Sequence, residues 1–378
     1  MRGQRVVAVA ALTLSASSLL ATVGCASVDG TASPQAVAEN FDGALEALRA
    51  APGVIDATFS LATSESDLEV TLDTNVTAAE LAVIGDRVEG LNGRADELAH
   101  PVHSTVLFLG YSSYSYFAGL SGEALDAQLA YWHDLIATGP DSVVIADGTT
   151  SVSAIGTLDT TPPAPAVVPG PRFVLIDLPE VAEASHLSTM LANLAAIDDP
   201  GAPSGQWRLV DLAPDTNAEF AKPEFPDRDR LASALDAGDI FGPIDVASVE
   251  VRQGPDEAAP LEISIASFDE SMDGISAAKA DQHFQRTDTH AQVTSLIDML
   301  ERRAVPAYEV SVLSSPLGDG GNFALRFGVE ECTFTGDSRW PSLSGKLGEH
   351  WLEHVALQRY PGGDKARDCT VVVPAPAD

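Results

Sequence analysis

One order of elements, helix then strand then strand then helix, recurs along this chain and limits how it can fold. Residues 44–82 contain the order once, residues 231–280 contain it again, and residues 297–330 repeat its opening. Within these segments apolar residues alternate with polar ones in the strands and recur every three or four positions in the helices. Two strands joined by a short turn must run antiparallel. The sequence therefore predicts an α+β fold of repeated helix-strand-strand-helix modules, with antiparallel sheets covered by helices.

This layout resembles the half-units of ferredoxin-like folds. The resemblance rests on the order of elements alone, and such folds host many unrelated activities, so no function follows from it. The pattern leaves open whether the modules share one sheet or fold separately.

Composition divides the chain into six segments. Residues 160–171 contain five prolines in twelve residues, which favours a stiff, extended linker. The predicted organisation is a signal peptide at 1–24, a lipidated cysteine and flexible tether at 25–37, a first α+β module at 38–159, the linker at 160–171, a second module at 172–285 and a third at 286–378.

The first 25 residues have the layout of a secretory signal peptide, because Arg2 and Arg5 precede an apolar stretch that ends near Val23. Thr22-Val23-Gly24-Cys25 resembles the lipobox of bacterial lipoproteins. The resemblance implies that Cys25 becomes the mature N-terminus and carries acyl chains such as palmitate. Such chains would anchor the protein to the outer, extracytoplasmic face of the cell membrane. The alternative is ordinary signal cleavage near Cys25 without a lipid.

The formal charge of −34 excludes one class of partner. A surface this acidic repels phosphate backbones, so we expect no nucleic acid to bind. Hydrophobic residues make up 45% of the chain, which is enough for a sizeable core. No dinucleotide or phosphate-loop motif occurs, and we expect no cofactor.

Two cysteines remain after the leader. Cys332 and Cys369 predict a disulfide in an exported protein, and the alternative is two buried free thiols.

The string His350-Trp-Leu-Glu353-His354 is an H-x-x-E-H motif. It resembles the zinc-binding core of the pitrilysin-like peptidases, and the resemblance implies that His350 and His354 bind zinc while Glu353 acts as general base. Those enzymes take a third ligand, a glutamate, from many tens of residues downstream, whereas this chain ends 24 residues after His354. An upstream carboxylate, for example Glu330 or Glu331, could replace it.

The same helix also has a structural interpretation. Leu347, Trp351 and Val355 form an apolar stripe, with Glu349 and Glu353 pointing outward, as in an amphipathic helix lying on a sheet. We favour this interpretation and predict neither a metal site nor an enzyme.

Five aromatic residues lie close together and allow two interpretations. Tyrosine-rich loops can line sugar or peptide sites, and alternate aromatics of a strand can pack into a core. The five are Phe108, Tyr111, Tyr114, Tyr116 and Phe117.

The sequence thus predicts a lipid-anchored cell-envelope protein with a non-catalytic binding or scaffolding role. Its partner, an envelope protein or a small molecule, is not specified by the sequence. The first alternative is a zinc-dependent hydrolase that uses the H-x-x-E-H helix, and the second is the substrate-binding lipoprotein of a transporter.

Overall fold

The computed structural model describes most of the chain after residue 33. The described residues are 34–61, 66–97, 102–117, 120–151, 167–179, 184–202, 205–213, 215–222, 224–242, 248–255, 259–267, 272–317, 322–356 and 369–375. None of the helices in these ranges is long and apolar enough to cross a membrane.

The described strands form one 14-stranded sheet in which every strand lies beside its neighbour in the sequence. The strands are β1 (Val54–Leu61), β2 (Ser66–Leu72), β3 (Val102–Leu109), β4 (Ser112–Phe117), β5 (Ser142–Ser151), β6 (Val167–Asp177), β7 (Gly205–Ala213), β8 (Thr216–Phe220), β9 (Ser248–Gln253), β10 (Leu261–Ala266), β11 (Ala307–Pro316), β12 (Asn322–Glu330), β13 (Thr333–Thr335) and β14 (Thr370–Val372).

Helices connect the strand pairs. They are α1 (Pro34–Arg49), α2 (Ala78–Glu97), α3 (Gly122–Ala137), α4 (Ala184–Ala195), α5 (Arg228–Phe241), α6 (Ala277–Phe284), α7 (Asp288–Arg302), α8 (Pro341–His350) and the π-helical segment η2 (Trp351–Ala356). The α+β class predicted from the sequence is confirmed.

The sheet is built from hairpins joined through helices. From β1–β2 to β11–β12, each hairpin is antiparallel. Successive hairpins meet as parallel neighbours, for example β2 with β3 and β4 with β5. A parallel neighbour requires a crossover connection, which a helix supplies each time. The repeating unit is therefore strand-strand-helix, stacked along one axis as in solenoid proteins.

The predicted modules share this one sheet. β5 and β6 pair antiparallel, and residues 167–171 of the predicted linker form the start of β6. The proline-rich segment thus lies between the two strands of one hairpin and does not separate two sheets. Residues 152–166 lie outside the described part of the chain.

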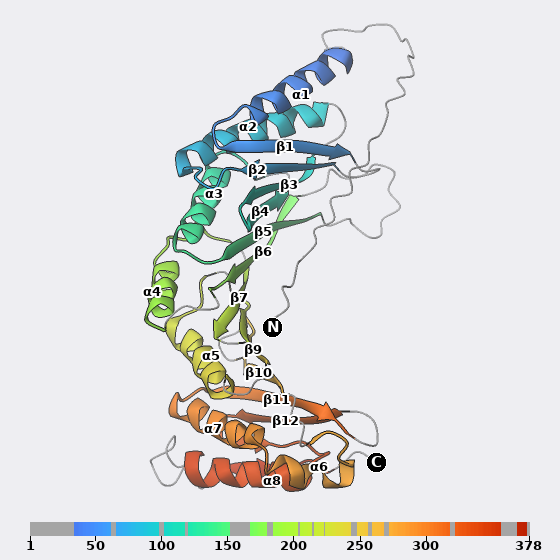
Figure 1. Cartoon of the computed structure of the whole chain (residues 1–378), viewed down its shortest axis with the longest axis vertical. Helices are drawn as coiled ribbons and strands as arrows, with labels where there is room; N and C mark the ends of the chain where they lie inside the picture. Colours follow the sequence, from blue (N-terminus) through green and yellow to red (C-terminus); the bar gives the residue numbers. More distant parts are fainter. Residues whose placement is uncertain are drawn as a thin grey trace, which may run out of the picture.

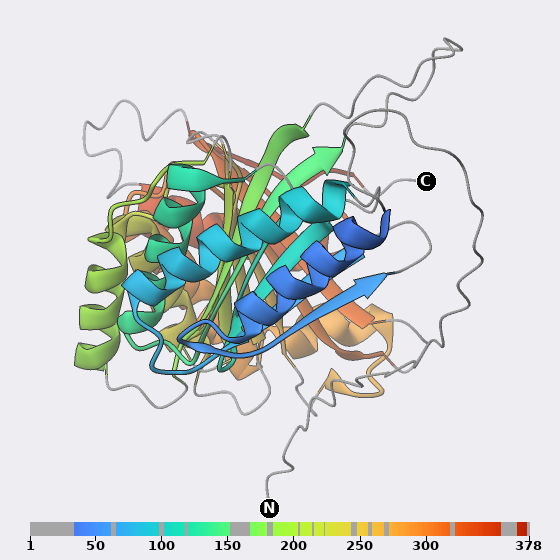
Figure 2. The same cartoon turned by 90° about the horizontal axis from the view of Figure 1, so that it is seen from above.

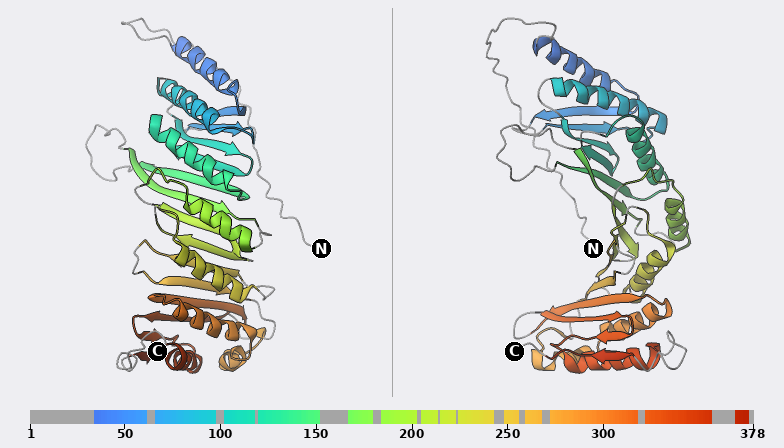
Figure 3. Two further views of the ribbon diagram at one scale, coloured as in Figure 1. Left: turned by 90° about the vertical axis from the view of Figure 1, so that its left-hand side faces the viewer. Right: turned by 180° about the vertical axis from the view of Figure 1, so that it is seen from behind.

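All of the described helices lie on one face of the sheet. The sheet curves along the stack, so the helices form the convex side and the uncovered sheet forms the concave side (Figure 1). The view from above shows the strands beside the helical layer, and the side views show the helices stacked in chain order (Figures 2 and 3). We call the uncovered concave surface the open face.

Strand alternation decides which side chains lie between sheet and helices. In β2, Leu68, Val70 and Leu72 are buried, whereas Asp67 and Glu69 point to the open face. Three tryptophans, Trp132, Trp207 and Trp351, are fully buried in the helix-side core. The capping of α2 follows its sequence signal, since Thr77 and Glu80 exchange the hydrogen bonds of a capping box.

Candidate functional site

The H-x-x-E-H string forms the end of α8 and the start of η2. His350 lies 2.9 Å, Nε2 to Oδ1, from Asp298 of α7. Leu347 and Trp351 are buried, and Trp351 donates its indole N–H to Glu301, 2.9 Å away. Glu353 is exposed. The described side chains therefore fit the amphipathic-helix interpretation, while the side chains of His354 and Val355 lie outside the described part.

A zinc ligand set is not assembled by the described residues, among which no group of three or more His, Cys, Asp or Glu side chains could hold a metal ion. Glu330 lies at the end of β12 and lines a pocket on the open face, and Glu331 occupies the turn that follows, with φ of 50°. His350 belongs to the helical layer.

Cys332 and Cys369 are joined by a disulfide, with their Cα atoms 4.6 Å apart. The bond links the turn after β12 to the start of β14, whose Thr370 N–H donates to the Cys332 carbonyl at 3.0 Å. It therefore fastens the last strand to the sheet. Cys25 and the whole leader lie outside the described residues, so their roles stay predictions.

The aromatic stretch divides between core and surface. Tyr114 and Tyr116 are buried on the helix side of β4. Phe108 points to the open face and Tyr111 is exposed in the turn between β3 and β4. The core interpretation holds for the two buried tyrosines, and Phe108 contributes to the surface described next.

A continuous row of paired residues crosses the open face from β1 to β14. Strand by strand it consists of Asp56, Thr71, Phe108, Ser113, Val144, Leu175, Arg208, Glu219, Arg252, Glu262, Glu309, Gly328, Thr335 and Val372. Facing residues of neighbouring strands interact directly, so this row sets the chemistry of the surface. Its character changes from polar to apolar to charged along the stack.

The apolar section lies in the first half of the sheet. Val106, Phe108, Val144, Phe173 and Leu175 come from β3, β5 and β6, and we call them the central patch. Phe108 has 37% of its surface exposed. Helices over a sheet face would bury such side chains, but none of the described helices lies over this face.

The charged section lies in the second half. Arg252 binds Glu250 at 2.8 Å and lies 3.9 Å from Glu219 of the neighbouring strand. Arg326 forms an ion pair with Glu309. Each arginine is thus held by a carboxylate on the same face.

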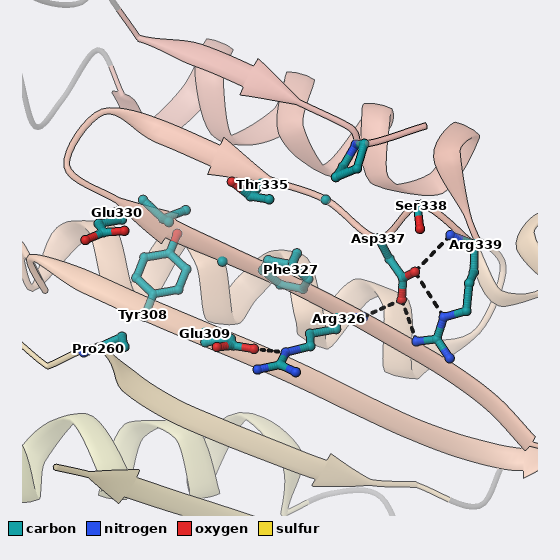
Figure 4. A pocket seen from close by; sticks show the side chains of 14 residues that line it. Pro260, Tyr308, Glu309, Arg326, Phe327, Glu330, Thr335, Asp337, Ser338 and Arg339 are labelled. Carbon is teal, nitrogen blue, oxygen red and sulfur yellow. Dashed lines mark hydrogen bonds and ion pairs between the residues drawn. The ribbon is translucent and has the colours of Figure 1, made fainter. Parts of the chain in front are cut away.

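A pocket of about 440 Å³ opens at the C-terminal end of this section (Figure 4). Gly328 lies between Glu309 and Thr335 in the row and supplies no side chain, which creates a hollow at this point. Arg326 and Arg339 line the pocket, and both also line a neighbouring hollow of about 380 Å³.

Asp337 holds the side chain of Arg339 in place at the rim of the pocket. Its carboxylate accepts from the Arg339 Nε and Nη2 groups, at 3.1 and 2.7 Å, and from the Arg339 and Arg326 backbone N–H groups, at 2.9 and 3.1 Å. Burial alone would raise the pKa of Asp337, but the hydrogen bonds and charge of Arg339 outweigh burial and lower it. The same contacts raise the pKa of Arg339.

A second polar cluster lies on the helix side of β4, β5 and β6, beside helix α3. Arg172, 1% exposed, binds Asp199 through two hydrogen bonds and stacks over Tyr131 at 5.1 Å. Asp147 faces Arg172 across the β5–β6 pair and accepts a hydrogen bond from Tyr114. Burial raises the pKa values of both Asp147 and Tyr114. This cluster joins helix α3 to the sheet and does not reach the open face.

Comparison with known proteins adds no relative: no protein-family model matches this chain, and no curated protein sequence matches it.

Sequence patterns did not predict the pocket. Most of its residues come from β11, β12, β13 and the segment after β13, and the strand register brings them together. One local signal exists, because a glycine inside an otherwise regular strand pattern marks a place where another group approaches the backbone.

Proposed function

We propose that this protein is a lipid-anchored component of a bacterial cell envelope, and that its open face binds a partner. The anchor rests on the leader and Cys25. The binding role is non-catalytic and uses the concave surface of the solenoid.

The observation that carries the proposal is the one-sided cover of the sheet. The described helices cover one face of the sheet (Figure 3). The other face carries the central patch and the charged section of the row. Solenoids with a curved, accessible surface use it to bind extended partners, because each repeat adds contact area along one direction. Exposed apolar side chains gathered on one surface favour an interaction role.

Photocrosslinking tests the binding surface. The photoreactive residue p-benzoylphenylalanine is placed at Phe108 or Leu313, which are 37% and 47% exposed on the open face, and at Val83, which is 44% exposed on α2. We expect one partner to be captured from both open-face positions in intact cells, and no capture from Val83. Phe108→Asp in the wild-type background should reduce co-purification of that partner. Equal capture from all three positions would refute a binding role for the open face.

The anchor is tested separately. Cys25→Ala should move the protein from the membrane fraction to the soluble fraction and prevent incorporation of labelled palmitate. Unchanged membrane association would contradict lipid attachment at this cysteine.

Metal analysis addresses the competing zinc hydrolase. We expect the full chain to retain no zinc after dialysis, since no group of three or more His, Cys, Asp or Glu side chains among the described residues could hold a metal ion. One zinc per chain that is lost in His354→Ala would overturn the non-catalytic proposal.

A further inference from the structure

The pocket beside Arg326 and Arg339 has the features of a small-molecule site. The two guanidinium groups are well exposed, with 68% and 59% of their side-chain surfaces accessible, although each is already held by a carboxylate. Its volume of about 440 Å³ lies within the ordinary range of ligand pockets.

Arg339 is oriented before any ligand arrives. Asp337 is 6% exposed and takes the Nε–Nη2 edge of the guanidinium. The Nη1–Nη2 edge is left for a second acceptor. A planar fork held in one orientation loses little freedom on binding and matches the two oxygens of a carboxylate.

The rest of the pocket offers hydrogen-bond acceptors and space. Glu330 and Thr335 are exposed at its wall, and Gly328 leaves its floor open (Figure 4). A Cβ atom at Gly328 would lie 3.3 Å from the Tyr308 carbonyl oxygen, so a side chain there would crowd the floor. A ligand that extends from Arg339 toward Gly328 and carries hydroxyl or ammonium donors would meet Thr335 first and Glu330 beyond it.

We propose that this pocket binds a small carboxylate that also carries hydroxyl or ammonium groups, with its carboxylate on Arg339. The inference deepens the proposed function, on which it rests, by assigning a ligand class to one end of the open face.

Charge favours a carboxylate with a single negative charge over a polyanion. The chain carries a formal charge of −34, which opposes the approach of multiply charged phosphates. Charges farther away than about 8 Å are largely screened at physiological salt, so the open Nη1–Nη2 edge of Arg339 outweighs the distant acidic surface for a small ligand. The carboxylates of Glu309, Asp337 and Glu330 in the pocket lining disfavour a second negative charge.

Calorimetric titration of the full chain tests the site with two probe pairs. The first pair is D-glucuronate and D-glucose, two hydroxylated compounds of which only the first carries a carboxylate. The second pair is L-alanyl-L-alanine and its amide, two compounds with an ammonium group of which only the first carries a carboxylate. We expect at least one carboxylate probe to bind with a dissociation constant on the order of 1 mM or below. Its neutral counterpart should bind roughly tenfold more weakly or not at all.

Variants locate the binding. Arg339→Gln should weaken binding of the carboxylate probe roughly tenfold. Arg339→Lys should weaken it less, because lysine keeps the positive charge but lacks the planar guanidinium fork. Gly328→Ala should also weaken binding without altering any charge. Arg252→Gln is the matched control, since Arg252 is another ion-paired arginine of the open face and does not line the pocket.

The inference is overturned if neither carboxylate probe binds, or if the neutral counterparts bind with equal affinity. It is also overturned if Arg339→Gln keeps both its affinity for the carboxylate probe and its unfolding temperature. None of these outcomes affects the crosslink at Phe108. That residue lies on β3, remote in the stack from β11–β13, so the proposed function stands or fails by its own test.

Discussion

Two aspartates, the buried Asp337 and the half-buried Asp147, show how local contacts give one residue type opposite roles. Asp337 accepts four N–H groups and has a lowered pKa, so the folded state favours its charged form. Asp147 accepts from Tyr114, but burial dominates and raises its pKa, so the folded state penalises its charge. The sign of each shift decides how each residue affects stability as pH changes.

For Asp337, the unfolded state binds the proton more tightly than the folded state. The stabilisation is therefore complete above the ordinary aspartate pKa of about 3.9 and is lost as pH falls through the lowered, folded-state value. Asp337→Asn should lower the free energy of unfolding by roughly 1–3 kcal/mol at pH 7, and by less near pH 3, where part of the stabilisation is already lost. Urea unfolding at both pH values measures this, and an equal loss at both would contradict an electrostatic role.

For Asp147 the sign is reversed, since its raised pKa gives a contribution that is present at low pH and lost as pH rises through the folded-state value. Asp147→Asn keeps an acceptor for Tyr114 and removes the charge, so the thermal midpoint at pH 7 should be unchanged or higher. Asp199→Asn is the matched comparison and should cost roughly 3–5 kcal/mol, because it leaves the charge of Arg172 buried. A larger loss in Asp147→Asn than in Asp199→Asn would contradict this assignment.

At the level of elements, the sequence predicts the helices and the longer strands but misses the shorter partner strands. β4 alternates serine with tyrosine, so Ser113 and Ser115 point to the open face while Tyr114 and Tyr116 enter the core. β8 has only five residues, and three of them are polar. Their pairing with longer strands stabilises both, and single-sequence propensity does not detect such tertiary support.

These missed strands explain why three modules were predicted where the structure has a longer series of hairpins. Without β4 and β8, the strands β3 and β7 lose their hairpin partners, and the proline-rich segment inside the β5–β6 hairpin resembles a linker. The candidate site shows the same limit. The H-x-x-E-H string is local and visible, whereas the pocket depends on the register of Gly328 with Glu309 and Thr335.

The edge strand β1 is protected by one side chain from helix α1 and one from β1 itself. Arg49 Nε donates to the Ala57 carbonyl at 2.8 Å, and the Asp56 carboxylate accepts from the Ala57 N–H at 2.8 Å. These contacts occupy backbone groups that could otherwise pair with another strand. At the other edge, β14 has three residues.

Removing that protection should promote self-association. The double variant Arg49→Ala, Asp56→Ala exposes the Ala57 backbone groups, so we expect concentration-dependent dimers in sedimentation velocity experiments. Arg303→Ala is a suitable control, because it removes an arginine ion pair with Asp236 away from either edge. Equal association of both variants would show that the β1 contacts are not what protects the edge.

For the whole molecule, strand-strand-helix stacking places the residues that stabilise the fold and the residues proposed to bind a partner on opposite faces of the sheet. The helical side supplies the core, since Trp132, Trp207 and Trp351 and the apolar strand residues are buried there. The open face carries few residues that the core requires, so its chemistry can vary from hairpin to hairpin. Because the core does not depend on the open face, that face can change from the central patch to the charged section of the row along the stack.

Net charge acts on the whole stack as well. With a formal charge of −34, unpaired carboxylates repel one another across the molecule, whereas local ion pairs such as Arg326–Glu309 and Arg172–Asp199 attract over short distances. Raising the ionic strength from about 0.01 M to about 0.15 M shortens the Debye length from roughly 30 Å to roughly 8 Å, which screens the distant repulsion more than the close contacts. The thermal unfolding midpoint should therefore rise with added sodium chloride. A midpoint that falls with salt would mean that the ion pairs contribute more to stability than the acidic surface takes away.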